Sequence, residues 1–285
     1  MEKDTVLLTE VLGLAGMLIL ENGGDTHRAE ETAERICAAA GRPGSDVLAL
    51  PTGIMITISP YCGKKDVPGA CVGDCAGCAR PAIACEGAEE PPVSLIRRVK
   101  KRTINLSKLE RANRAARAFT DGKASLSETL SSLREIDAQP RRSIYLEAAY
   151  SALSCGLFSL LFGGGWFELL AAFVCGFLAQ IVASALQKSS IFQFASSFIG
   201  AVVIASLAAL FVSFTGLGNI NIIITGSLMN LLPGLAMTNA IRDTMTGDLV
   251  SGVARFADVL LIAMSLAGGV GIVLSVFISL GGTVR

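Results

Sequence analysis

Residues 217–240 carry polar side chains within an otherwise apolar stretch, and they are the first candidates for chemistry in this chain. Asn230 precedes the pair Pro233-Gly234, and Asn239 follows it. Proline removes a backbone donor and crowds the preceding turn, so a helix is expected to break here. In a bilayer, the freed carbonyl groups need polar partners from protein or from a water-lined cavity. A broken helix also exposes a positively polarised start that can hold a substrate carboxylate.

Two interpretations of this break remain open. In one, polar residues around it line a substrate path, and a basic residue attracts a carboxylate from one side. In the other, Pro233 kinks a span and the asparagines bond to neighbouring helices. Asp243 and Asp258 are the candidates for a coupling proton, although either could instead cap a helix or pair with an arginine. The candidate substrate-binding residues are Asn230, Pro233, Gly234, Asn239 and Arg242.

Cysteines crowd the segment 60–91, which is rich in glycine and proline. In a reducing cytoplasm, thiols this close favour a metal over a disulfide, and four thiolates suit tetrahedral zinc. An iron–sulfur cluster is the weaker alternative, and an unliganded or redox-active loop is a third reading. The candidate ligands are Cys71, Cys75, Cys78 and Cys85, with Cys62 as an alternative.

His27 is the only histidine of the chain. A lone histidine in a helix-capping turn is usually structural, and no serine or cysteine nucleophile is spaced to use it. We therefore predict that the protein is not an enzyme. The basic run at 97–102 is either a solvated face or a docking site for anionic lipid. Because the formal net charge is zero, bulk charge gives no case for nucleic-acid binding.

The elements that must position these residues fall into two halves that meet near Arg142. Residues 1–142 carry 20 Lys/Arg and 19 Asp/Glu, which is 39 of the 48 charged side chains. The remaining residues break into apolar stretches long enough to cross a bilayer's hydrocarbon core of ~30 Å. The chain is 52% hydrophobic, and its mean hydropathy is +0.58. This composition predicts a membrane domain over 143–285 behind a soluble domain over 1–142.

The membrane half is predicted to be α-helical, with five transmembrane helices. The uncharged runs within it are longer than globular cores usually contain. Small residues at helical spacing, such as Ala201, Ala205 and Ala209, would let these helices approach closely. The predicted spans are residues 144–162, 167–187, 191–213, 217–240 and 256–281.

Basic residues at the span ends predict the orientation. They precede the first predicted span (Arg134, Arg141, Arg142), separate the second from the third (Lys188) and separate the fourth from the fifth (Arg242, Arg255). The loops on the other side, 163–166 and 214–219, hold no Lys or Arg. The N-terminus is therefore expected in the cytoplasm and the C-terminus outside the cell.

The front half reads as a small α/β domain with the cysteine-rich loop 60–91 inserted. An amphipathic helix packed on this domain is expected over residues 6–20, and a second helix that Asp25 can cap is expected over residues 25–40. Short strands are expected over 47–50, 54–59 and 93–99. Two further helices are expected over 105–119 and 125–136, with Leu126, Leu130 and Leu133 as an apolar stripe.

Several motifs resemble the threonine/serine exporter family. In the front half they are Gly23-Gly24-Asp25-Thr26-His27-Arg28, Pro51-Thr52-Gly53 and Arg102-Thr103-Ile104-Asn105. In the membrane half they are Leu232-Pro233-Gly234 through Asn239-Ala240-Ile241-Arg242-Asp243, then Gly247-Asp248 and Gly252. The cysteine-rich loop departs from the family pattern.

The resemblance implies a transport function. Full-length members carry about ten spans, so five suggest the larger chain of a split form whose second chain is a small membrane protein. That form is similar to bacterial exporters of small amino acids or of dicarboxylates such as succinate. We therefore expect a subunit of a proton-coupled secondary exporter in the cell membrane, paired with a second chain or another copy. The alternatives are a membrane-anchored metal or redox sensor and an uncoupled channel.

Overall fold

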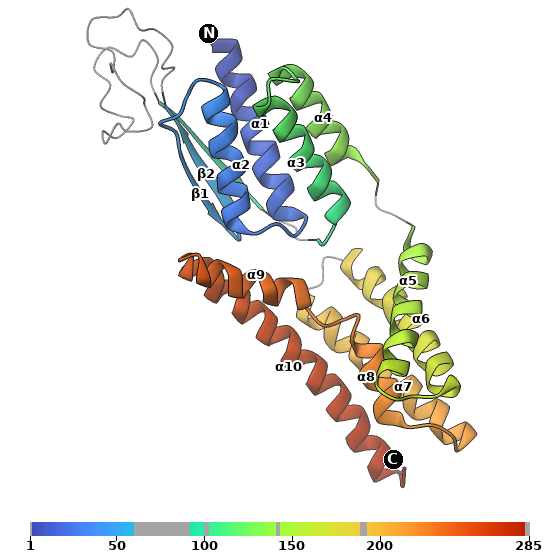
Figure 1. Cartoon of the computed structure of the whole chain (residues 1–285). Helices are drawn as coiled ribbons and strands as arrows, with labels where there is room; N and C mark the ends of the chain where they lie inside the picture. The colour runs from blue at the N-terminus through green and yellow to red at the C-terminus, as the bar shows by residue number, and fades with distance from the viewer. Residues whose placement is uncertain (1, 60–91, 100–102, 141–142, 189–192, 283–285) are drawn as a thin grey trace, which may run out of the picture. The chain divides into compact units, whose positions relative to one another are not determined.

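The computed structural model describes residues 2–59, 92–99, 103–140, 143–188 and 193–282 (Figure 1). The cysteine-rich segment 60–91, with all five candidate metal ligands, lies outside these residues. So do Arg141, Arg142 and the second half of the basic run at 97–102, which is residues 100–102. Within the described part of the chain, no group of three or more His, Cys, Asp or Glu side chains gathers as a metal site would require. The chain divides into two compact units: unit 1 comprises residues 1–139 and 235–255, and unit 2 comprises residues 140–234 and 256–285.

Unit 1 contains a three-stranded antiparallel sheet. Its strands are β1 (Asp46–Leu50), β2 (Gly53–Ile58) and β3 (Val93–Arg98), with β2 in the centre. Alternate residues of β2 face the core: Ile54, Ile56 and Ile58 are fully buried, whereas Met55 between them is exposed. This period of two follows from the pleat of a strand, and it fixes which face of the sheet packs against helices.

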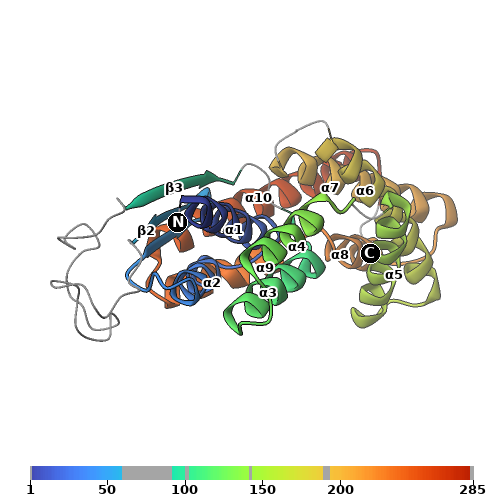
Figure 2. The same ribbon diagram turned by 90° about the horizontal axis from the view of Figure 1, so that it is seen from above.

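Four helices complete the N-terminal part of unit 1 (Figures 1 and 2). They are α1 (Glu2–Glu21), α2 (Thr26–Ala39), α3 (Leu106–Thr120) and α4 (Leu126–Ala138). Helix α1 contacts β2 and β3 on one side and α3 and α4 on the other, so it forms the middle layer. Its residues Leu12, Leu18 and Ile19 are completely buried in the core. The apolar stripe expected on α4 also faces this core, through Leu130 and Leu133.

A later segment of the chain also belongs to unit 1. Residues 235–255 group with residues 1–139 in one compact unit. They comprise most of α9 (Gly234–Met245) and the first turns of α10 (Leu249–Ser279). The turn between these helices contains Gly247, whose φ of 98° suits glycine. The sequence-based division at residue 142 had placed this segment with the membrane half.

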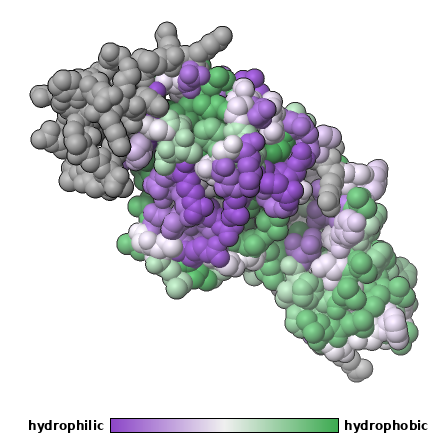
Figure 3. Space-filling view, turned by 45° about the horizontal axis from the view of Figure 1, so that its top comes forward, coloured by the Kyte–Doolittle hydropathy of each residue, from purple (hydrophilic) through white to green (hydrophobic). Residues whose placement is uncertain are grey.

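Unit 2 is a bundle of apolar helices. It contains α5 (Ile144–Leu161), α6 (Trp166–Lys188), α7 (Gln193–Thr215), α8 (Ile220–Leu228) and the part of α10 that begins at Phe256. On the face shown in Figure 3, hydrophobic residues dominate the surface of these helices, whereas hydrophilic residues cover much of unit 1. A soluble bundle would bury such residues, so this surface suits a lipid environment.

Four helices of the described chain are long and apolar enough to cross a membrane: α5, α6, α7 and α10. The sequence predicted five spans, and the difference lies at 217–240. That region is not one helix but two, α8 and α9, separated by residues 229–233. Helix α8 has nine residues and is therefore only about 13 Å long, too short to cross a hydrocarbon core of ~30 Å. The break falls where Pro233 was expected to place it.

Small residues bring the helices of unit 2 close together. Ala201 and Ala205 on α7 are fully buried. A Cβ added to Gly269 of α10 would lie 2.8 Å from the carbonyl oxygen of Phe198 on α7. At Gly226 of α8, an added Cβ would lie 2.8 Å from the backbone nitrogen of Ser159 on α5. These helices therefore pack backbone against backbone, as small residues allow in membranes.

Candidate functional site

The first candidate site surrounds the helix break in unit 2. The Asn230 side-chain amide donates to the Ser151 hydroxyl of α5 at 2.7 Å and to the Gln180 side-chain oxygen of α6 at 3.2 Å. Gln180 in turn donates to Ser184 at 3.5 Å. We call these four residues the break network. They form an uncharged group of donors and acceptors between apolar helices.

The backbone around the break explains why Asn230 is available for these contacts. The amides of Leu231 and Leu232 both donate to the carbonyl of Leu228, so the last turn of α8 tightens and stops. Pro233 cannot donate, and the chain restarts as α9 at Gly234. Ser227, one turn before Leu231, accepts a contact from the Cys155 thiol of α5 at 3.3 Å through its carbonyl oxygen. Neighbouring helices therefore supply part of the bonding that the break disturbs.

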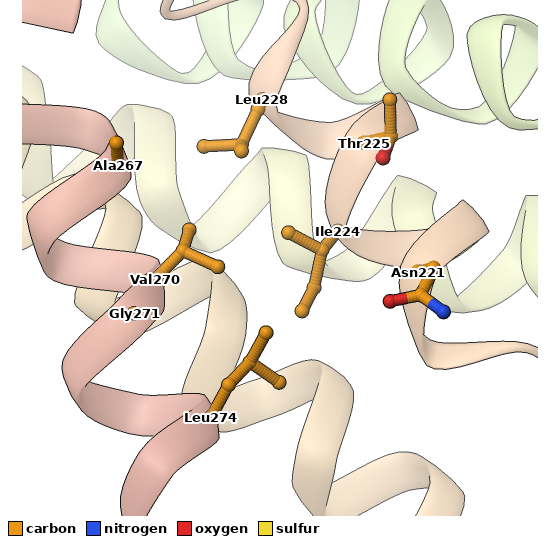
Figure 4. A pocket seen from close by; sticks show the side chains of 8 residues that line it. All are labelled: Asn221, Ile224, Thr225, Leu228, Ala267, Val270, Gly271 and Leu274. Carbon is orange, nitrogen blue, oxygen red and sulfur yellow. The ribbon is translucent and has the colours of Figure 1, made fainter. Parts of the chain in front are cut away.

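A shallow groove lies elsewhere in unit 2, between α8 and α10 (Figure 4). Ile224 and Leu228 line it from α8, and Val270 and Leu274 line it from α10. Asn221 adds a polar group on the α8 side. None of the substrate-binding residues predicted from the sequence lines this groove, so it is a separate feature from the break network.

The second candidate site lies in unit 1, where four consecutive residues of the front domain bind the segment 235–255. These residues form the Gly23–Thr26 loop, which precedes α2. The four contacts are Asn239 Nδ2 to the Gly23 carbonyl at 3.0 Å, Arg255 Nη2 to the Gly24 carbonyl at 3.3 Å, Arg242 Nη1 to Asp25 Oδ2 at 2.8 Å and Thr26 Oγ1 to Asp248 Oδ2 at 3.1 Å. Each loop residue thus has its own partner more than 200 positions along the chain. We call Asp25, Arg242, Asp243, Asp248 and Arg255 the charged cluster.

The innermost pair of the charged cluster is Asp243 and Arg255. Asp243 is completely buried, and Arg255 Nε lies 2.9 Å from its Oδ2 atom. Arg255 Nε is not aligned for a hydrogen bond to this oxygen, so the contact is an ion pair. Burial raises the pKa of Asp243, while Arg255 and the hydroxyl of Thr26 lower it and the carboxylates of Asp25 and Asp248 raise it further. Asp243 is therefore a buried acid with an increased proton affinity.

The outer pair is Asp25 and Arg242. Asp25 is buried because it caps α2: its Oδ1 atom accepts the backbone N–H of Arg28 at 2.7 Å. Its Oδ2 atom faces Arg242, and the more distant Arg28 guanidinium lies 3.7 Å away. The side chain of Arg242 is 49% exposed, compared with 3% for Asp25. One carboxylate thus serves both as a helix cap and as a counter-ion.

The structure separates residues that the sequence had grouped. Asn230 belongs to the break network, whereas Asn239 and Arg242 bind the Gly23–Thr26 loop. Asp258 is exposed on α10, unlike the buried Asp243. Pro233 and Gly234 lie at the break itself. The residues that the sequence did not identify as site residues are Ser151, Gln180, Asp25, Thr26, Asp248 and Arg255.

A signal existed for some of these missed residues. Gln180 is an amide within a predicted span, where polar groups are costly unless they have a partner. Asp25 and Thr26 stood out in the sequence, but as a helix start. Nothing in the local sequence indicates that they contact residues 239–255. His27 follows this loop on α2 and is not one of the residues that contact segment 235–255.

Several apolar helices that are long enough to span a bilayer define the class of multi-pass membrane proteins. The chain belongs to the threonine/serine exporter family: the family described as "Putative threonine/serine exporter" matches residues 10–67 and 82–277. This is a family of exporters and not of enzymes. Together with the apolar helices, it indicates a multi-pass protein of the cell membrane.

Two relatives carry the same description. The chain is 28% identical to a "Threonine/serine exporter" of Corynebacterium glutamicum over 186 residues, which cover 64% of this chain and 38% of the relative. It is 24% identical to a "Probable threonine/serine exporter" of Mycobacterium tuberculosis over 195 residues, which cover 68% of this chain and 36% of the relative. The matched region thus spans less than half the length of each relative. No solved structure matches the chain.

Proposed function

We propose that this chain is a subunit of a secondary exporter that moves threonine, serine or a small dicarboxylate such as succinate out of the cell. Family membership and the names of both relatives support export of amino acids. The observation that carries the proposal is the break network, because a purely structural span has no need for two helices and the segment 229–233 to direct amide and hydroxyl groups to one point.

In this proposal, the break network contacts the substrate during its passage. Asn230 offers both a donor and an acceptor, and Ser151 and Gln180 extend the polar surface onto α5 and α6. Pro233 and Gly234 interrupt the helix, and broken helices are where transporters commonly hold a substrate carboxylate. The network is uncharged, so it would bind a zwitterion or a dicarboxylate weakly enough to release it.

The charged cluster supplies charge and the coupling proton. Arg242 is half-exposed and attracts a substrate carboxylate at the cytoplasmic side. Between the two candidate proton carriers, the structure favours Asp243, because it is completely buried and its pKa is raised. Asp258 is exposed on α10 and makes a less suitable carrier. Asn239 then positions the Gly23–Thr26 loop and does not touch the substrate.

Further membrane segments complete the transporter in this proposal. The relatives are more than twice as long as the region they share with this chain, which supports additional segments from a second small membrane protein or another copy. Unit 1 lies in the cytoplasm and the C-terminus of α10 faces outside, so the interrupted segment 217–233 provides a fifth crossing in addition to the four spanning helices. Zinc binding by Cys71, Cys75, Cys78 and Cys85 stays a prediction from the sequence, which the zinc content of the purified chain would test.

The first experiment measures efflux from cells preloaded with threonine, serine or succinate, with this chain expressed alone and with a candidate partner. We expect efflux that an uncoupler abolishes. Efflux that persists with the uncoupler would indicate a channel, and no efflux of any substrate with both chains in the membrane would contradict the proposal.

Matched variants locate the substrate path. Asn230→Ala should reduce efflux at unchanged protein level, whereas Asn221→Ala, the same change in the groove between α8 and α10, should not. A loss of efflux in Asn221→Ala but not in Asn230→Ala would indicate that the substrate path follows the groove between α8 and α10. For the proton, Asp243→Asn should remove the effect of the uncoupler, and Asp258→Asn should preserve it.

A further inference from the structure

We propose that Asp25 is an internal competitor for the substrate carboxylate at Arg242, and that this competition sets the substrate concentration at which export begins. The inference rests on the proposed function and assigns Arg242 as a carboxylate-binding residue with a resident counter-ion. The ligand class is a small carboxylate, either an α-amino acid or a dicarboxylate. Asp25 is then a specificity- and affinity-determining residue located in the front domain.

The geometry gives the two members of the pair different freedom. Asp25 is fixed from two sides, since it caps α2 and sits in a loop whose neighbours are bound by Asn239, Arg255 and Asp248. Arg242 makes a single described contact, through Nη1, and about half of its side chain is exposed. A guanidinium presents five donors in a planar fork, so a free carboxylate can approach the exposed edge of Arg242.

The Asp25 side chain and the ligand bind Arg242 through the same chemical group, a carboxylate. A side-chain carboxylate at 2.8 Å from a guanidinium nitrogen occupies the place that a substrate carboxylate would take. A ligand must therefore replace this contact or share the guanidinium with it. The observed affinity for the ligand equals the intrinsic affinity multiplied by the fraction of molecules in which Arg242 is available. The result is a weak site that fills only when the cytoplasmic pool of the carboxylate is large.

Among the charged residues of the cluster, Arg242 is the cation that a carboxylate ligand can reach. Arg255 is nearly buried and is paired with Asp243, so a ligand does not reach it. Asp248 accepts from Thr26 and carries a negative charge. Arg28 is exposed and lies 3.7 Å from Asp25, so it adds positive potential without a close contact.

The variant Asp25→Asn tests this idea with little risk to the fold. Asparagine caps helices about as well as aspartate, so α2 keeps its start while the charge on Arg242 loses its partner. The matched control is Glu31→Gln, which removes an acidic charge from an exposed pair with Arg35 on the same helix. Thermal unfolding of each purified full-length variant checks that the fold persists.

Equilibrium binding to the purified chain uses three probes: L-threonine, succinate and threoninol, in which a hydroxymethyl group replaces the threonine carboxylate. We expect Asp25→Asn to bind threonine and succinate roughly tenfold more tightly than the unmodified chain, as the loss of one charge-assisted contact implies. Threoninol affinity should not change, and Arg242→Gln added to Asp25→Asn should cancel the gain.

Three outcomes would overturn the proposal: unchanged affinity for both carboxylates, an equal gain for threoninol, or the same gain in Glu31→Gln. The result is separable from the export proposal. Tighter carboxylate binding by Asp25→Asn without any efflux would keep this inference and reject export. Efflux together with an unaltered carboxylate affinity in Asp25→Asn would keep the export proposal and reject this inference.

Discussion

The break network and the charged cluster solve the problem of buried polar groups in different ways. In unit 2, the network uses neutral amides and hydroxyls that satisfy one another. In unit 1, the cluster uses carboxylates and guanidinium groups, and Asp25, Asp243 and Arg255 are almost entirely withdrawn from solvent. A charge is far more costly to desolvate than an amide, so the charged groups lie in the unit that is not a lipid-facing bundle. The comparison teaches that neutral polar groups and charged groups are buried in separate parts of one chain.

The largest expected effect comes from Arg255→Ala. This change leaves the carboxylate of Asp243 buried without its ion pair, which typically costs ~3–5 kcal/mol. Arg35→Ala is the matched control, because it removes a solvent-exposed partner of Glu31 and should cost no more than ~1 kcal/mol. Thermal unfolding of both purified variants measures the contrast. Equal losses would show that burial does not distinguish the charged cluster from an ordinary surface pair.

Gly226→Ala should have the next largest effect, and it tests the packing beside the break network. The new Cβ would lie within 3 Å of three atoms of Ser159, two of them backbone, so α8 and α5 must separate, at a cost of ~1–3 kcal/mol. Gly271→Ala meets no atom within 4 Å and should be tolerated. The unfolding temperatures of the two variants in the same detergent provide the measurement. If Gly271→Ala proved the more harmful, α10 would have an important contact at this position.

The pH dependence of stability should separate the two regions further. The folded state holds the Asp243 proton more tightly than the unfolded chain, whose ordinary pKa is 3.8. The contribution of this carboxyl to stability is therefore complete below that value and declines as the pH rises through the raised folded pKa. Accordingly, the unfolding temperature of the unmodified chain minus that of Asp243→Asn should decrease as the pH rises. A difference that grows with pH would mean that Arg255 dominates and lowers the pKa.

Ser151→Ala should have the smallest effect on stability. It removes one hydrogen bond of the break network, and such bonds contribute on average ~0.6 kcal/mol in a membrane protein. The loss is further limited because Gln180 still bonds to Asn230. Efflux should fall more clearly than the unfolding temperature does. A large loss of stability with normal efflux would instead identify Ser151 as a packing residue.

The sequence predicted those features that have local causes. Pro233 indicated the break, Asp25 indicated the start of α2, and uncharged runs indicated α5, α6, α7 and most of α10. The number of spanning helices was different because a hydropathy argument over 217–240 combines α8 and α9, whose apolar residues are continuous across the break. Asp243 was a candidate from its charge alone, but its burial depends on Arg255 and on the front domain.

The contacts that assemble the charged cluster could not be predicted from local sequence features. Asp25 and Arg242 are 217 positions apart, and neither residue differs locally from a helix cap or a surface arginine. Asn239 was paired with Asn230 because both flank Pro233, although α9 directs Asn239 to the carbonyl of Gly23. Such pairings depend on how the chain folds back over long distances, which residue types and spacings do not specify.

The membership of residues 235–255 in unit 1 has a consequence for biosynthesis. The ribosome must produce residues 140–234, with three candidate spanning helices among them, before the partners of the Gly23–Thr26 loop exist. At typical rates of ~5–20 residues per second, this delay lasts several seconds to some twenty seconds. During that interval the loop is uncovered, and Asp25 has no Arg242 to bind. The charged cluster can therefore assemble only after all three of these helices have been synthesised.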